Sequence, residues 1–177
     1  DAQRIVARKS IGLLPKSLSA LFQKRIADLQ ERTVEPDTAW KHDKDKRGRA
    51  LWHRVAMDVE AKEQTRDARM AAALNFPNSK TAAKRLYGKR GLRGGNGILL
   101  WVVEDQYKKL VDGFANGTQD QIIRLTGALI HFATDAAFPF AATANYDGKL
   151  TGNLHLGRLR LGHPHYAHRN VAARFSA

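Results

Sequence analysis

Two long helical patterns, separated by Asn116-Gly117, constrain the fold of this chain most. Apolar side chains recur at three- and four-residue spacing across residues 99–114, the pattern of one face of a helix. Asn-Gly is typical of a helix C-terminus, and Thr118 with Gln121 fits a capping box that begins the next helix. That second helix is apolar almost all round as far as about Ala136, which indicates burial.

The rest of the chain is predicted to be mostly helical, with loops between shorter helices. Helical periodicity covers residues 3–13, 16–31, 81–87 and 170–177. A charged run and five glycines predict loops at 34–49 and 88–97, and 145–168 is a long irregular connection rich in Gly, Asn, His and Pro. We therefore expect an all-α single domain over residues 1–177, with about six helices and a long C-terminal loop. The chain starts at Asp1 and stops inside a predicted helix, so we expect truncation at both ends.

Composition narrows the possible functions. Thirty Lys and Arg residues against seventeen Asp and Glu give a net charge of +13, which favours phosphate esters, nucleic acid or an anionic membrane surface as partners. The absence of cysteine excludes a disulfide framework, a Cys-ligated zinc finger, an iron–sulfur cluster and a thiol nucleophile. No transmembrane helix is expected, because His131, Asp135 and Pro139 interrupt the longest weakly charged stretch, 125–146.

Four residues are candidate metal ligands. His131 and Asp135 share one face of the apolar helix, and a buried carboxylate needs a partner or a metal. The spacing alone leaves two alternatives, a His–Asp pair within the core or a metal site. His53 lies among large apolar residues and Asp37 in a loop; each alone can equally be structural or solvated. Together, two histidines and two carboxylates would suit zinc.

Two further clusters have more than one interpretation. Five basic residues lie in and before the glycine-rich loop, where they form either a solvated basic face or an anion-docking surface: Lys84, Arg85, Lys89, Arg90 and Arg93. The glycine spacing matches neither a P-loop nor a dinucleotide-binding turn. Loose histidine clusters can bind zinc adventitiously, and the C-terminal loop contains His155, His163, His165 and His168.

Several segments in order resemble the all-helical superfamily of bacterial zinc-dependent phospholipase C and secreted single-strand-specific nucleases. Residues 96–104, NGILLWVVE, resemble the family's N-G-x-x-P-W helix start, with Leu100 in place of Pro. Residues 131–135, HFATD, resemble its H-[FY]-x-x-D core helix, and 138–141, FPFA, fall on its Q-P-[LM]-H turn. Trp52-His53 and Pro36-Asp37 fall on the upstream His and Asp.

The resemblance implies a hydrolase of phosphate esters whose cleft holds up to three zinc ions. Asp37, His53, His131 and Asp135 match the ligands of one zinc. Ligands of the second are replaced at Ala141, Ala172 and Ser176, unless the His-rich loop substitutes for them, and the third needs an N-terminal Trp and a His that this chain lacks. We therefore expect one ion, with Asp37 orienting or deprotonating the attacking water and the basic segment 84–93 holding the anionic substrate. Secretion or a periplasmic location is implied as well.

Three functional hypotheses follow. The first is a zinc-dependent phosphoesterase with a reduced metal site, acting on phospholipid or nucleic acid. The second is a catalytically impaired relative that acts as a binding or structural protein, in which the remaining ion stabilises the fold. The third is a basic helical module that binds nucleic acid or anionic lipid by charge, without metal.

Overall fold

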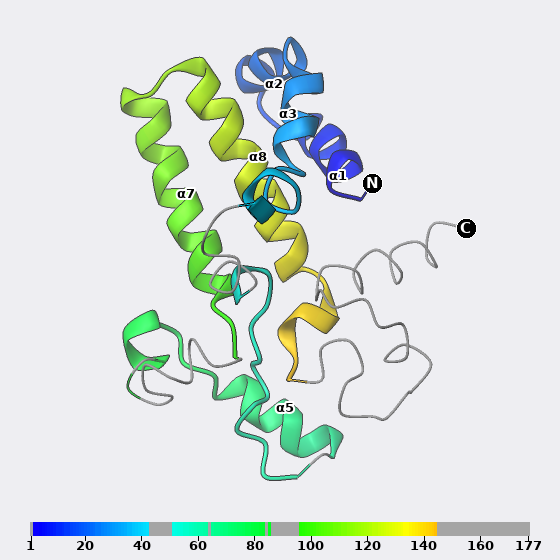
Figure 1. The fold of residues 1–177 in the computed structure, drawn as a ribbon, viewed down its shortest axis with the longest axis vertical. Helices are drawn as coiled ribbons and strands as arrows, with labels where there is room; N and C mark the ends of the chain where they lie inside the picture. Colours follow the sequence, from blue (N-terminus) through cyan, green and yellow to red (C-terminus); the bar gives the residue numbers. More distant parts are fainter. Residues whose placement is uncertain (1, 43–50, 64, 84, 86–95, 145–177) are drawn as a thin grey trace, which may run out of the picture. The chain divides into compact units, whose positions relative to one another are not determined.

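The computed structural model describes residues 2–42, 51–63, 65–83, 85 and 96–144, and these residues are mostly helical (Figure 1). The α-helices include α1 (Ala2–Ile11), α2 (Lys16–Gln23), α3 (Ile26–Arg32), α5 (Arg66–Leu74), α7 (Leu99–Asn116) and α8 (Gln119–Ala136). Short 3-10 helices are η1 (Ala39–His42), η2 (Leu51–His53) and η3 (Pro139–Ala142). The described part of the chain contains no strand, only an isolated bridge between Val55 and Gly97. The prediction of an all-α chain is confirmed for this part.

The structure differs from two of the predicted elements, and some of the other predictions lie outside the described residues. The helix expected over 16–31 is two helices, α2 and α3, because Arg25 leaves helical geometry with φ −128° and ψ 30°. The loop expected at 34–49 contains the short helix η1. The predicted C-terminal loop and final helix, with all four of their histidines, lie outside the described residues.

The described chain forms two compact units, and the first comprises residues 1–46 and 102–135. Its core is built from α1, α2, α3 and α8 through the buried side chains Ala7, Ile11, Phe22, Leu29 and Ile123. Phe22 also meets Phe114 of α7 edge to face, with 6.5 Å between ring centroids. Apolar burial of this kind contributes about 25 cal/mol per Å² of surface removed from water and is the main source of stability here.

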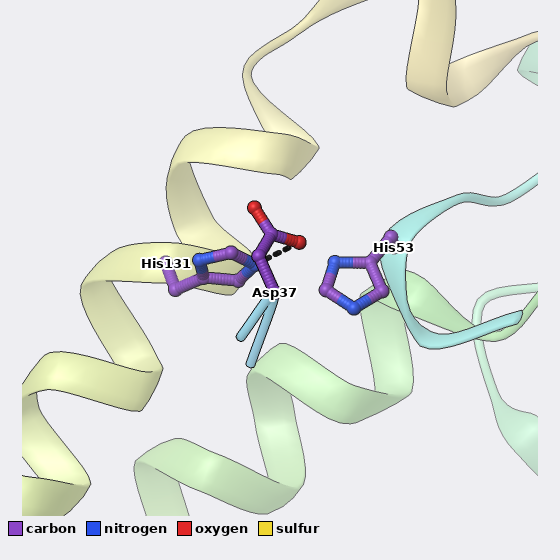
Figure 2. A group of neighbouring side chains, drawn as sticks. All are labelled: Asp37, His53 and His131. Carbon is purple, nitrogen blue, oxygen red and sulfur yellow. Dashed lines mark ion pairs between the residues drawn. The ribbon is translucent and has the colours of Figure 1, made fainter. Parts of the chain in front are cut away.

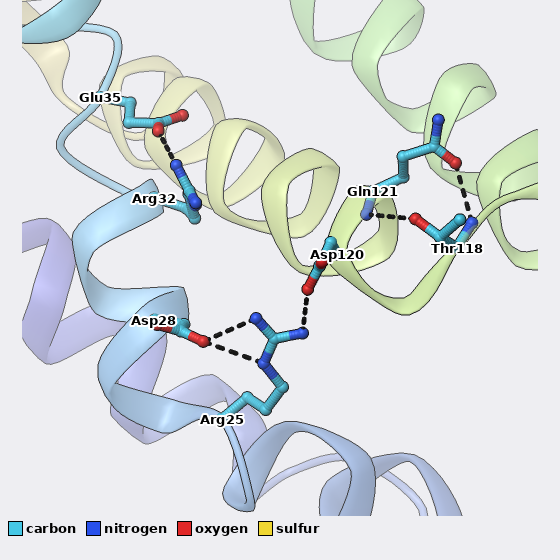
Figure 3. A network of polar contacts seen from close by, with 7 residues as sticks. All are labelled: Arg25, Asp28, Arg32, Glu35, Thr118, Asp120 and Gln121. Atoms are coloured by element: carbon cyan, nitrogen blue, oxygen red, sulfur yellow. Dashed lines mark hydrogen bonds and ion pairs between the residues drawn. The ribbon is translucent and has the colours of Figure 1, made fainter.

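The connection between α7 and α8 has the capping chemistry that the sequence predicts. The Thr118 amide donates to the Gln121 side chain at 2.8 Å, and the Gln121 amide donates to the Thr118 hydroxyl at 3.3 Å (Figure 3). Gly117 closes the preceding helix by donating to the Gly113 carbonyl at 2.9 Å. Both helix ends therefore satisfy backbone groups that would otherwise lack partners.

The second unit comprises residues 47–101 and 136–177, of which the part up to Ala144 is described. The Val55 and Met57 amides donate to the carbonyls of Ala141 and Ala142, at 2.7 and 3.1 Å. Gly97 has φ +77°, and a Cβ there would overlap the Arg54 carbonyl, so only glycine fits. No helix in the described residues is long and apolar enough to cross a membrane.

Asp58 organises the polar interior of the second unit. Its carboxylate, 7% exposed, accepts hydrogen bonds from Arg69 Nε at 2.6 Å, Thr143 Oγ1 at 2.8 Å and the Ala144 amide at 2.6 Å. Burial alone would raise the pKa of Asp58, but these donors together hold the pKa below its ordinary value of 3.8. The carboxylate thus connects α5 to the segment after η3.

A pair of glycine substitutions tests the packing of the first unit. A Cβ at Gly127 of α8 would overlap the Cβ of Arg32 and lie 2.8 Å from its carbonyl carbon, whereas one at Gly113 of α7 would meet only the end of the Leu125 side chain at 2.9 Å. We expect Gly127→Ala to lower the free energy of unfolding by about 1–3 kcal/mol. The matched control Gly113→Ala should be neutral or stabilising by up to about 1 kcal/mol, because alanine favours helix. Urea unfolding measures both, and equal effects would contradict the close α8–α3 contact.

Asp58 predicts an acid-dependent loss of stability. Because its pKa is lower in the folded than in the unfolded chain, its contribution is full above about pH 4 and is lost as pH falls through the folded pKa. Asp58→Asn should cost about 1–3 kcal/mol at pH 7, since Arg69 loses its charged acceptor, and should flatten the decline below pH 4. Urea unfolding from pH 2.5 to 7 measures this. The exposed Asp67→Asn should change stability by less than about 1 kcal/mol and keep the wild-type acid dependence.

Candidate metal site

The candidate site begins with the close approach of α8 to the end of α3. Gly127 is buried in this contact, and no side chain larger than hydrogen fits there. His131 lies one turn further along the same face of α8. The backbone of Thr33, the first residue after α3, therefore comes within hydrogen-bond distance of the His131 ring.

The orientation and tautomer of His131 follow from that contact. Its Nδ1 lies 2.7 Å from the Thr33 carbonyl oxygen, and both residues are fully buried. A carbonyl oxygen only accepts, so Nδ1 must carry a hydrogen and donate it. In the neutral ring Nε2 then holds a lone pair. Histidine ligands of metals commonly have their second ring nitrogen fixed in this way.

Two carboxylates face Nε2 of His131. The Asp135 Oδ2 atom, from the next turn of α8, lies 3.3 Å from Nε2, and the Asp37 Oδ1 atom lies 3.8 Å from it (the latter pair in Figure 2). One imidazole nitrogen and two carboxylates are donors that zinc and related ions accept. This group of His131, Asp37 and Asp135, which we call the His131 cluster, could therefore hold a metal ion.

A proton and a metal ion would compete for the same nitrogen. Burial lowers the pKa of His131, but the hydrogen bond with Asp135 and the negative charges of Asp135 and Asp37 outweigh it, so the pKa lies above its ordinary value of 6.5. The same negative potential that favours the proton also favours a cation. Binding of a metal at Nε2 must displace that proton.

The turn that carries Asp37 is fixed by its own hydrogen bonds. The Asp37 and Thr38 amides both donate to the Val34 carbonyl at 3.1 Å, and the Thr38 hydroxyl donates to the same oxygen at 2.9 Å. Trp40 of η1 packs on Phe132 of α8 with 6.2 Å between ring centroids. The Asp37 side chain is therefore held close to α8 while remaining 33% exposed.

The remaining predicted residues are distributed as follows. His53 ends η2 in the second unit, where it is 5% exposed; Figure 2 also labels it. Ala141 is buried in η3 with its carbonyl bonded to Val55, and its methyl group offers no ligand atom. Arg85 is a helical residue, and it is exposed. The other predicted substrate-binding and ligand positions lie outside the described residues: Lys84, Lys89, Arg90, Arg93, Ala172 and Ser176.

Sequence reasoning missed two residues on which the His131 cluster depends. Thr33 contributes through its main-chain carbonyl, which every residue type has, so no sequence signal identifies it. Gly127 carries a weak signal, because glycine within an otherwise strong helix often marks a close contact.

Comparison with protein-family models, with curated proteins and with solved structures gives no match for this chain. The resemblance to zinc-dependent phospholipases and nucleases therefore stays a prediction, carried by the motifs in the sequence.

The His131 cluster predicts stabilisation by zinc. Zinc at about one hundred times its dissociation constant should stabilise the folded chain by about 2.7 kcal/mol, measured as a rise in melting temperature. His131→Ala removes the nitrogen donor and should abolish this rise, and Asp135→Asn should weaken it. His163→Ala is the matched control and should keep the full rise. A rise that persists in His131→Ala and disappears in His163→Ala would place the ion in the His-rich segment instead.

Proposed function

We propose that this chain binds one zinc ion through Asp37, His131 and Asp135, with His53 as the fourth ligand, and hydrolyses phosphate esters at this site. The observation that carries the proposal is the anchored His131 ring, whose Nε2 faces two carboxylates. Four N/O donors would complete the tetrahedral set that zinc prefers. The assignment of His53 rests on the order of the motifs in the sequence.

The two carboxylates differ in exposure, and this suggests different roles. The Asp135 side chain is 10% exposed and the Asp37 side chain 33%, while His131 is fully buried. Solvent and substrate therefore approach the cluster from the side of Asp37. Asp37 would orient the attacking water and accept its proton as the oxygen bonds to phosphorus, and the leaving alcohol would take up a proton as its ester bond breaks. A bound zinc ion supplies Lewis acidity toward the phosphoryl oxygen.

The reaction would proceed with a reduced metal site. Ala141 stands where the resembled family has a histidine, and a methyl group cannot bind metal. One ion cannot hold both the attacking and the leaving oxygen, as two-metal sites do. We therefore expect turnover that is slow for this class of enzyme.

The substrate would be anionic, in keeping with the net charge of +13. The basic segment 84–93 remains the proposed substrate-binding region, and phospholipid and nucleic-acid esters are both compatible with it. A secreted or periplasmic location belongs to the same proposal.

Hydrolysis of bis(p-nitrophenyl) phosphate tests the activity. We expect zinc-dependent release of p-nitrophenol, lost with a chelator and reduced at least about 100-fold in Asp37→Asn, because general-base catalysis contributes factors of about 10² to 10⁴. The exposed Glu60→Gln should retain wild-type rates. Elemental analysis of each variant separates loss of the ion from loss of the base, and the same analysis on His53→Ala decides whether His53 is a ligand.

A second candidate function is favoured by Ala141, which leaves the second zinc position without its histidine. In that case the ion stabilises a binding or structural protein. Chelation would then lower the melting temperature while no hydrolysis is detected at any zinc concentration. An absence of both zinc binding and hydrolysis would contradict the two functions together.

A further inference from the structure

The N-terminal segment, residues 2–27, carries positive charge and no negative charge of its own. Between Ala2 and Ala27 there are six basic residues and no acidic one: Arg4, Arg8, Lys9, Lys16, Lys24 and Arg25. Arg4 pairs with Glu31 at 2.9 Å, and Arg25 pairs with Asp28 at 2.7 Å and with Asp120. The other four are exposed, and none of them pairs with an acidic residue in the described part of the chain.

Exposed apolar side chains lie among these charges. Ala7 and Ile11 place one face of α1 in the core. Yet Ile5 is 60% exposed and Val6 39% exposed on the same helix, and Leu13, in the turn before α2, is 87% exposed. Helix α1 therefore has a second apolar surface that contacts no described part of the core. Arg8 and Lys9 of the same helix and Lys16 at the start of α2 are exposed as well.

A shallow groove lies on this surface. It has a volume of about 370 Å³, and the described residues that line it are Ile5, Arg8, Lys9 and Gln30. The hydrocarbon stems of Arg8 and Lys9 can line apolar space while their charged ends remain in the polar layer above it. This arrangement suits a ligand that presents anionic groups over hydrocarbon.

We propose that α1 and the following turn bind the surface of an anionic phospholipid membrane. The docking face, which we call the N-terminal face, comprises Ile5, Val6, Arg8, Lys9, Leu13 and Lys16. Basic residues attract anionic headgroups, and apolar side chains gain by entering the boundary between headgroups and acyl chains. Nucleic acid would satisfy the charges through its phosphates, but its backbone offers no hydrocarbon for Leu13 and Ile5. The exposed apolar residues therefore decide in favour of the membrane.

Membrane binding by the N-terminal face does not depend on the proposed hydrolase activity. No residue of the N-terminal face belongs to the His131 cluster. Membrane binding should consequently persist when a chelator is present. A failure of zinc binding and a failure of membrane binding are thus separate results.

A single fluorescent label tests which surface contacts the membrane. The chain has no cysteine, so Leu13→Cys and Leu74→Cys each accept one environment-sensitive dye. Both leucines are highly exposed, at 87% and 79%, and Leu74 of α5 is the matched control. With vesicles of phosphatidylcholine and phosphatidylglycerol in a 7:3 ratio, the dye at position 13 should shift to the blue and the dye at position 74 should not. No shift at position 13, or equal shifts at both, would overturn the proposal.

Charge reversal tests the electrostatic part by vesicle cosedimentation in about 0.1 M salt. Each basic residue near an anionic surface contributes about fivefold to partitioning, so Arg8→Glu with Lys9→Glu should reduce binding at least about 30-fold. Lys62→Glu with Lys109→Glu changes the net charge equally and should reduce binding far less. Leu13→Ser should weaken binding about fivefold without changing its salt dependence. Far-ultraviolet circular dichroism checks folding, and Lys9→Gln with Lys16→Gln is a milder replacement if the reversal variant unfolds.

Two results would contradict the membrane assignment. One is equal binding to anionic vesicles and to pure phosphatidylcholine vesicles. The other is binding of a single-stranded oligonucleotide that falls in Arg8→Glu with Lys9→Glu, together with vesicle binding that this variant leaves unchanged. The second result would assign the N-terminal face to nucleic acid.

Discussion

The hydrogen bond from His131 Nδ1 to the Thr33 carbonyl is the interaction on which the first unit and its candidate site depend. It joins the C-terminal part of α8 to the residue that follows α3, across 98 positions of sequence. The bond forms because Gly127 allows the two helices to approach closely. It also satisfies a buried carbonyl that would otherwise cost about 1–3 kcal/mol. The same bond fixes which ring nitrogen faces Asp37 and Asp135, so packing and chemistry share one constraint.

The many surface ion pairs of this unit contribute less than the buried contacts. Arg4 and Glu31 are 40% and 68% exposed, and such pairs stabilise by about 0–1 kcal/mol each. Arg25 has a more specific effect: it bridges Asp28 and Asp120 where the chain leaves α2 and enters α3 (Figure 3). The guanidinium therefore helps to fix the direction in which the chain enters α3, and it contributes less to the free energy of unfolding.

The sequence predicts what depends on local pattern and misses what depends on distant partners. Helices α7 and α8 and their capping box were predictable, because periodicity and cap residues lie within each segment. The break at Arg25 was not, since no Gly or Pro marks it and one of its partners, Asp120, lies 95 residues away. The pairing of His131 with Asp135 follows from helical spacing. The approach of Asp37 and the carbonyl of Thr33 requires the tertiary fold.

Acidic and basic side chains are unevenly distributed in the first unit, although the chain as a whole is strongly basic. Arginines pair with four carboxylates of this unit: Asp28, Glu31, Glu35 and Asp120. Arg8, Lys9, Lys16 and Lys24 are exposed and pair with no acidic residue in the described part of the chain. Asp37 and Asp135 instead lie close to the His131 ring, with 3.8 and 3.3 Å between a carboxylate oxygen of each and Nε2. A proton or a metal ion at Nε2 would place a positive charge beside both carboxylates. In a strongly basic chain, the His131 cluster is thus a small group of side chains that could hold a cation, and it shares no residue with the exposed basic side chains of α1 and α2.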